Sequence, residues 1–300
     1  FVSREQCIKD TEEVLSTPDI PIRQTEDIFR INVLGMDWDL GMVVYEPEDP
    51  KKIPVGADGK KAGFFLLHGG SGDFKGIENN ADYIKGMGFD AIWLTPIVDN
   101  PDEAFTGGDA VVWKGMFQDK GKTGYHGYWG SNFYRVDEHL PSKDLDFGTL
   151  NHELSERGIH TVLDIVGNHG SPAFGMPVAQ PKYGQIFDAS GTLVADQQNL
   201  PADRLDPANN PLHRFYNNKT EMVQLSDLNE NNPAVMDYLV GAYLQWIEQG
   251  ADAFRIDTIK HMPLPFWKEF SRRIREKNPD FFMFAEAYDF DAAKIARLLA

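Results

Sequence analysis

The chain contains three short apolar segments that each end in polar side chains, and this feature restricts its possible folds more than any other. The segments are residues 161–169 (TVLDIVGNH), 253–257 (AFRID) and 281–286 (FFMFAE). Amphipathic helical patterns separate them, and alternating strands and helices predict an α/β fold with a parallel sheet. In a β/α barrel all strands end on one face, so the polar side chains are expected to converge there.

Arg255 and Asp257 lie two residues apart in the predicted strand at 253–256, so they point to the same face of the sheet. Burying an arginine and a carboxylate is costly, which leaves a structural ion pair or a functional opening as alternatives. Without further motifs, this arginine and aspartate would be interpreted as a structural ion pair. Gly250 ends an amphipathic helix just before the strand, and the order of helix, glycine and strand is half of a β/α unit.

Five motifs follow one another in a consistent order along the chain. They are HGYW (126–129), DIVGNH (164–169), LSDLNENNP (225–233), FRIDTIKH (254–261) and FAEAY (284–288). Together they resemble the conserved regions of glycoside hydrolase family 13, the α-amylase family. One such motif would be weak evidence, whereas five in order are strong evidence. The LSDLN and FRIDTIKHMP stretches are most similar to the cyclodextrin glucanotransferase and maltogenic amylase branch of that family.

The resemblance implies a (β/α)8 TIM barrel with an irregular domain B inserted after its third strand. Only about the first five β/α units are present, and five strands cannot close an eight-stranded barrel. The family's Asn-His-Asp motif has no counterpart after Glu286, so we expect the rest of the barrel beyond Ala300. The predicted barrel strands are 62–68, 90–95, 160–165, 253–256 and 281–286, and the predicted helices are 74–88, 147–157, 233–249, 264–277 and 291–299.

The expected domain organisation follows from these elements. Residues 1–61 form an N-terminal segment of uncertain structure, with possible strands at 25–34 and 42–45. The predicted parts of the barrel are then 62–168, with a long substrate loop at 97–135, the domain B insertion at 169–232, and the continuation at 233–300.

Retaining hydrolysis of a glycosidic bond requires a carboxylate nucleophile and a carboxylic acid about 5 Å apart. Neighbouring strands lie about 4.8 Å apart, so Asp257 and Glu286 are expected to meet this spacing. Arg255 is expected to keep Asp257 ionised, whereas nearby negative charge and partial burial are expected to keep Glu286 protonated. The resemblance assigns the same roles: Asp257 is the nucleophile and Glu286 the acid/base.

Sugars offer apolar C–H faces to aromatic rings and hydroxyl groups to imidazoles, which suits the HGYW motif to sugar binding. An aromatic cluster is more often part of a core, but this one lies among glycines and lacks apolar periodicity. The resemblance implies that Tyr128 stacks on the sugar, that His126 and His169 bond its hydroxyls, and that Asp164 orders the site through Arg255. The predicted substrate-binding residues are His126, Tyr128, Trp129, His169, Arg255, Lys260, His261 and Tyr288.

A structural calcium ion (Ca²⁺) is implied by the resemblance alone. Its predicted ligands are the side chains of Asn168 and Asp227, the backbone carbonyl of His261 and a further carbonyl of domain B. These are hard oxygen donors of the kind that calcium prefers. Without the resemblance, an isolated amide and carboxylate would be interpreted as ordinary polar groups of loops.

The charge balance restricts the class of partner. The chain has 46 acidic and 29 basic residues and a net charge of −17, which disfavours nucleic acid and anionic membranes. The sequence contains no apolar run long enough for a membrane span, and the single Cys7 excludes an internal disulfide framework. The expected partner is a neutral α-glucan or maltooligosaccharide, and the resemblance implies an extracellular or periplasmic location.

Three functions remain open at this point. The first is hydrolysis of α-1,4-glucosidic bonds in starch-like glucans, and the second is transglycosylation like that of the cyclodextrin glucanotransferases. In the cyclising enzymes an aromatic residue stands four positions before the calcium-type aspartate, where this chain has Val223, so hydrolysis is favoured. The third is a non-catalytic carbohydrate-binding relative, which the presence of Arg255, Asp257 and Glu286 disfavours.

Overall fold

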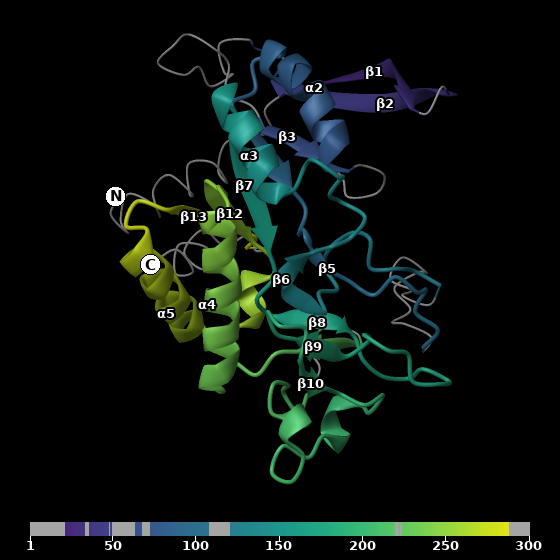
Figure 1. Cartoon of the computed structure of the whole chain (residues 1–300), viewed down its shortest axis with the longest axis vertical. Coiled ribbons are helices and arrows are strands. Elements are labelled where there is room, and N and C mark those ends of the chain that lie inside the picture. The colour runs from purple at the N-terminus through teal and green to yellow at the C-terminus, as the bar shows by residue number, and fades with distance from the viewer. Residues whose placement is uncertain are drawn as a thin grey trace. The chain divides into compact units, whose positions relative to one another are not determined.

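The structure is a computed structural model that describes residues 22–33, 36–47, 49, 64–67, 73–107, 121–219, 222 and 224–287, the first strands and 64–67 by their backbone only. The chain divides into two compact units, residues 1–63 with 289–300, and residues 64–288 (Figure 1). In the first unit, β1 (Ile22–Val33) and β2 (Met36–Pro47) form an antiparallel hairpin. Both predicted N-terminal strands are confirmed, and the second is much longer than expected.

The second unit is built on a five-stranded parallel sheet with the order β13-β12-β7-β4-β3. Each strand pairs with the next of the five along the chain, as successive strands of a β/α barrel do. All five predicted barrel strands are therefore confirmed. Their bounds are β3 (Phe64–Leu67), β4 (Ala91–Leu94), β7 (His160–Ile165), β12 (Ala253–Ile256) and β13 (Phe282–Ala285).

One helix follows each of the first four strands in chain order, which confirms four of the predicted helices. Side chains cap the N-termini of three of these helices: oxygens of Asp73, Asp146 and Asn232 accept hydrogen bonds from backbone N–H groups of the first turn. The helix at 264–277 follows Pro263 and has no side-chain cap. The predicted helix at 291–299 lies outside the described residues. The four helices are α2 (Phe74–Gly86), α3 (Phe147–Glu156), α4 (Pro233–Glu248) and α5 (Leu264–Lys277).

Aromatic side chains attach α4 and α5 to the sheet. The buried ring of Tyr243 on α4 lies edge-on to Phe254 of β12 and to Phe270 of α5, with centroid distances of 5.7 Å and 5.9 Å. Such pairs contribute about 0.5–1.5 kcal/mol each beyond the burial of their area. The Tyr243 hydroxyl also accepts a hydrogen bond from the backbone N–H of Val166 at 3.0 Å. Helix packing therefore holds the chain directly after β7 in place.

The segment between β7 and α4, predicted as an irregular domain B, contains more regular structure than expected. Two short antiparallel sheets and two 3-10 turns form there. Gly184 and Gly191 have positive φ and lie directly before the strand at 185–187 and in the turn between it and the strand at 193–196. The boundaries of a separate domain stay a prediction. The elements are β8 (His169–Pro172), β9 (Gln185–Phe187), β10 (Leu193–Asp196), η2 (Ala202–Arg204), η3 (Pro211–His213) and β11 (Leu225–Asp227) (Figure 1).

The HGYW motif lies close to the end of β4 and belongs to the long loop at 97–135. β5 (Val98–Asp99) and β6 (Asn132–Val136) pair in antiparallel fashion within it. Gly127 has a φ of 86°, and a Cβ atom there would lie 2.0 Å from the carbonyl oxygen of Pro96. Only glycine permits this approach, which holds the HGYW motif against the C-terminal end of the sheet. Among the described residues, no helix is long and apolar enough to cross a membrane.

Candidate active site

The guanidinium group of Arg255 lies at the centre of a group of three carboxylates. Its Nη1 is 2.9 Å from Asp164 Oδ1 and 2.8 Å from Asp257 Oδ1, and its Nη2 is 3.2 Å from Glu286 Oε2. Asp164 belongs to β7, while Asp257 and Glu286 directly follow β12 and β13. The side chains of Arg255 and Asp164 are 10% and 0% exposed. The predicted convergence of polar side chains from three strand ends is therefore present.

The charges of this group depend on one another. Burial raises the pKa of Asp164 to about 6, although the Arg255 guanidinium and the Tyr128 hydroxyl both lower it. Burial opposes the charged form of Arg255, yet Asp164, Asp257 and Glu286 raise the pKa of Arg255 above its usual range. Every hydrogen bond to Asp164 comes from a donor on a neighbouring side chain, so the arrangement requires its ionised form.

Two aromatic side chains donate hydrogen bonds to Asp164. The Tyr128 hydroxyl lies 2.8 Å and the Trp93 indole Nε1 3.2 Å from Asp164 Oδ2. Burial and the negative charge of Asp164 raise the pKa of Tyr128. The sequence reasoning placed Tyr128 beside a sugar and missed Trp93 altogether. The signal that was available is a tryptophan in an apolar strand, because a buried indole N–H normally needs an acceptor.

Glu286 directly follows β13, and its side chain is 42% exposed in the described part of the chain. Its Oε2 lies 3.2 Å from Arg255 Nη2, and the backbone N–H of Thr258 donates to the same oxygen at 3.3 Å. Arg255 also contacts Asp257, so a second carboxylate shares this guanidinium. The described sheet contains five strands of an eight-stranded barrel, and the expectation that partial burial and negative charge keep Glu286 protonated stays a prediction.

The HGYW motif forms an aromatic cluster in which only part is accessible. The His126 ring stacks on Tyr128 with a centroid distance of 5.8 Å and lies edge-on to Trp129 at 4.8 Å. Trp129 is only 5% exposed and packs against the buried rings of Phe105 and Tyr183. The predicted sugar contact of Trp129 does not fit this burial. The indole instead packs against the His126 ring.

Comparison with known proteins decides which family this arrangement belongs to. The family model described as the catalytic domain of alpha amylase matches residues 55–299. The chain belongs to the α-amylase family. This confirms the resemblance on which the glycoside hydrolase expectation was based.

Relatives of this α-amylase-family chain include both amylases and glucanotransferases. It is 31% identical to a cyclomaltodextrin glucanotransferase of Klebsiella oxytoca over 74% of this chain and 33% of that protein. It is 28% identical to an alpha-amylase of Streptomyces lividans over 82% of this chain and 30% of that protein. The chain therefore spans about a third of the length of these relatives.

Solved structures agree with this assignment. The cyclomaltodextrin glucanotransferase CldA is 31% identical, with a TM-score of 0.58 over 72% of this chain and 42% of that chain. An alpha-amylase of Anoxybacillus is 30% identical, with a TM-score of 0.54 over 80% of this chain and 49% of that chain. The α-amylase catalytic domain implies a (β/α)8 barrel, of which the described sheet contains five strands.

The remaining predicted substrate residues of the α-amylase-family site have contrasting environments. His169 is buried, and burial lowers the pKa of its imidazole to about 4, so the ring is neutral at neutral pH. Lys260 and His261 belong to the 3-10 turn η4 (Ile259–His261) and are exposed to solvent. The predicted stacking residue Tyr288 lies outside the described residues.

The two side chains predicted to bind calcium lie at adjoining strands, because Asn168 directly precedes β8 and Asp227 is the last residue of β11. His169 of β8 pairs with Asp227 of β11, and the backbone N–H of Leu228 donates to the carbonyl oxygen of Asn168 at 2.8 Å. Both Asn168 and Asp227 are buried. A buried carboxylate beside a buried amide is a donor set that fits a hard cation such as Ca²⁺.

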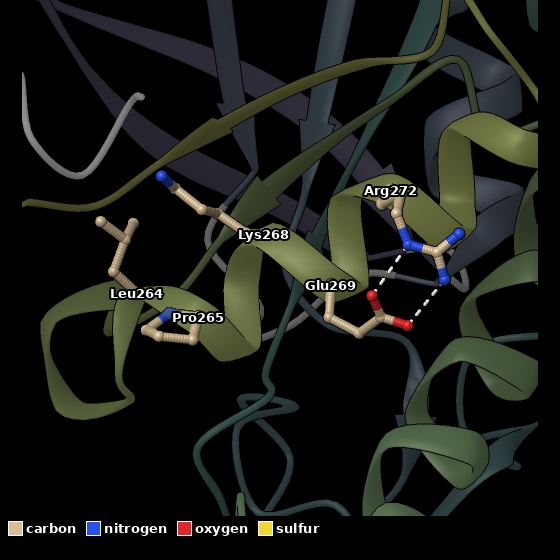
Figure 2. A pocket seen from close by; sticks show the side chains of 5 residues that line it. All are labelled: Leu264, Pro265, Lys268, Glu269 and Arg272. Carbon is tan, nitrogen blue, oxygen red and sulfur yellow. Dashed lines mark hydrogen bonds and ion pairs between the residues drawn. The ribbon is translucent and has the colours of Figure 1, made fainter.

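A pocket on α5 is lined by Leu264, Pro265, Lys268, Glu269 and Arg272 (Figure 2). Both guanidinium contacts between Arg272 and Glu269 measure 2.8 Å and are exposed to solvent. None of the predicted catalytic, substrate-binding or calcium-binding residues lines this pocket, so we assign it no part in the site.

We predict that Arg255→Met lowers the free energy of unfolding by about 3–5 kcal/mol, because it leaves buried carboxylates without their cation. Combining it with Asp164→Asn should cost less than the sum of the two single changes, since the double variant removes both charges. Denaturant unfolding of the full-length protein measures the free energy of unfolding of the wild type, the two single variants and the double variant. The matched control is Arg272→Met. The ion pairs of Arg272 are exposed, so water can replace them and the loss of stability should be small. Equal losses for Arg255→Met and Arg272→Met would contradict the central role of Arg255.

Proposed function

We propose that the protein hydrolyses α-1,4-glucosidic bonds of starch-like glucans or maltooligosaccharides with retention of anomeric configuration. The observation that carries this proposal is the single guanidinium of Arg255, which lies 2.8 Å from Asp257 and 3.2 Å from Glu286. It brings two carboxylates from neighbouring strands to one place, as a retaining glycosidase requires. Asp257 is the proposed nucleophile and Glu286 the proposed acid/base.

In the proposed mechanism, Asp257 attacks the anomeric carbon while Glu286 protonates the departing glycosidic oxygen. Arg255 Nη1 lies 2.8 Å from Asp257 Oδ1 and orients that carboxylate for the attack. Glu286 then removes a proton from the water that hydrolyses the glycosyl-enzyme. Its Oε2 lies 3.2 Å from Arg255 Nη2, so one guanidinium orients both proposed catalytic carboxylates.

Glucan transfer is a second candidate function, favoured by the 31% identity to a cyclomaltodextrin glucanotransferase. Both functions need the same two carboxylates and differ in whether water or a sugar hydroxyl accepts the glycosyl group. Val223, at the place where cyclising enzymes have an aromatic residue, supports hydrolysis as the main reaction, although it lies outside the described residues. Linear products from starch would support hydrolysis, and cyclic products would support transfer.

We predict that Asp257→Asn and Glu286→Gln, made in the full-length protein, differ in kind as well as in rate. Asp257→Asn should abolish turnover and leave glucan binding largely intact, because it removes the nucleophile but keeps its shape. Glu286→Gln should still react slowly with a glycosyl fluoride, whose leaving group needs no proton. Azide should then accelerate the second step in Glu286→Gln only, because an anion needs no general base.

The control is Glu269→Gln, an exposed carboxylate on α5 that should retain wild-type kinetics. The measurements are steady-state rates on starch and on the fluoride, and the anomeric configuration of the first product. Wild-type starch hydrolysis in both site variants, or an inverted first product, would rule out this assignment.

We also propose that Asn168 and Asp227 bind a structural calcium ion, with the backbone carbonyl of His261 as a further ligand. Both side chains are buried, with Asn168 directly before β8 and Asp227 in the adjoining strand β11, and this supports the proposal. A bound calcium ion would link the β8–β11 pair to the chain after β12. An extracellular or periplasmic location, implied by the family, stays a prediction.

If this calcium site exists, chelation should lower the melting temperature of the full-length protein. An ion that binds only the folded state contributes about 2.7 kcal/mol at a concentration one hundred times its Kd. Asp227→Asn should melt at a lower temperature in calcium and should no longer respond to the chelator. Unchanged melting of the wild-type protein in excess chelator, with no calcium detected by elemental analysis, would exclude the site.

A further inference from the structure

Trp93 stands in β4, which supplies no charged side chain to the site. It pairs with Val162 of β7, two residues before Asp164, so the side chains of Trp93 and Asp164 share one face of the sheet. Its strand neighbours Ile92 and Leu94 point to the opposite face and are buried, whereas Trp93 is half-buried. Trp93 therefore faces the carboxylate group from the next strand of the sheet.

One indole contacts both members of the Arg255–Asp164 ion pair. In the plane of the ring, Nε1 donates to Asp164 Oδ2 at 3.2 Å. Above the plane, the Arg255 Cζ atom lies 5.3 Å from the ring centroid, within range of a cation–π interaction. The ring also lies edge-on to Phe284 of β13, with a centroid distance of 5.9 Å and an interplanar angle of 81°. Phe284 thus limits the orientations that the indole can adopt.

The orientation of Arg255 matters because its two terminal nitrogens have different partners. Nη1 contacts Asp164 and Asp257, while Nη2 contacts Glu286. A rotation of the guanidinium would break the contacts to both proposed catalytic carboxylates at once. The indole face on one side and the buried Asp164 carboxylate on another restrict that rotation.

We propose that Trp93 is a positioning residue that fixes Asp164 and Arg255, and through them the relative placement of Asp257 and Glu286. This inference rests on the proposed function. Trp93 itself takes no part in proton transfer or bond formation. Its contribution is to hold the ion pair in the orientation that serves both carboxylates.

The proposal has a consequence for pH dependence. Asp164 is faced by Arg255 and Asp257 from β12, by the Tyr128 hydroxyl from the long loop and by Trp93 from β4. Burial already raises the pKa of Asp164, and loss of an N–H donor raises it further, because the donor stabilises the ionised form. Protonated Asp164 no longer holds Arg255, so the acid limb of kcat/KM should move to higher pH.

The experiment compares Trp93→Phe with Trp246→Phe in the full-length protein. Trp246 on α4 is buried and also donates its indole N–H, but to the backbone carbonyl of Phe133 at 3.0 Å and not to a carboxylate. For Trp93→Phe we expect the acid limb of kcat/KM on maltooligosaccharides to rise by about one pH unit. At its pH optimum kcat should fall about tenfold with little change in KM. Trp246→Phe should lower the melting temperature and leave the pH profile unchanged.

The inference would be overturned if the pH profile of kcat/KM for Trp93→Phe had the same shape and midpoint as that of the wild type. An equal shift of the acid limb in Trp246→Phe would also overturn it. Trp93→Tyr, which also lacks the indole N–H, replaces Trp93→Phe if the latter does not fold. If neither accumulates as folded protein, the role of Trp93 is structural and the inference fails. Failure of the proposed function would look different, because wild-type protein without glucan hydrolysis, or an active Asp257→Asn variant, would show it directly.

Discussion

The arrangement of the site depends on placing one guanidinium among three carboxylates at the end of a largely apolar sheet. Burying the charge of Arg255 alone would cost several kcal/mol after relaxation, so it persists only with close counter-charges. Asp164 and Asp257 supply them at 2.9 Å and 2.8 Å, from two paired strands, and Glu286 adds a third contact at 3.2 Å. A shift of one residue in the register of β7 against β12 would turn Asp164 to the opposite face of the sheet.

The rest of the second unit maintains that register. Arg255 of β12 pairs with Asp164 of β7 on one side and with Phe284 of β13 on the other. One layer of the sheet therefore contains the cation, its buried counter-ion and an aromatic ring. Trp93 and Tyr128 approach this layer from β4 and from the long loop, and both donate hydrogen bonds to Asp164. The loop reaches that position because Gly127 passes the carbonyl oxygen of Pro96 at a distance that only glycine permits.

The sequence was sufficient to predict the five strands, four helices and the meeting of Arg255, Asp164, Asp257 and Glu286, because alternation and strand ends are local properties. It was insufficient where the outcome depends on which side chains surround a group. Trp93 was missed because its acceptor, Asp164, is 71 residues away. Trp129 was expected at the substrate but is buried, since Phe105 and Tyr183 pack over it from distant segments.

The central claim is that Asp257 forms a covalent bond to the sugar, and trapping of the glycosyl-enzyme tests it most directly. The full-length protein would be incubated with a fluorinated glycosyl fluoride whose hydrolysis from the enzyme is slow, then digested and mapped by mass spectrometry. The account predicts one added glycosyl group on the peptide that contains Asp257, and none in the Asp257→Asn variant. A glycosyl group attached to Glu286 or to any other residue would contradict the account.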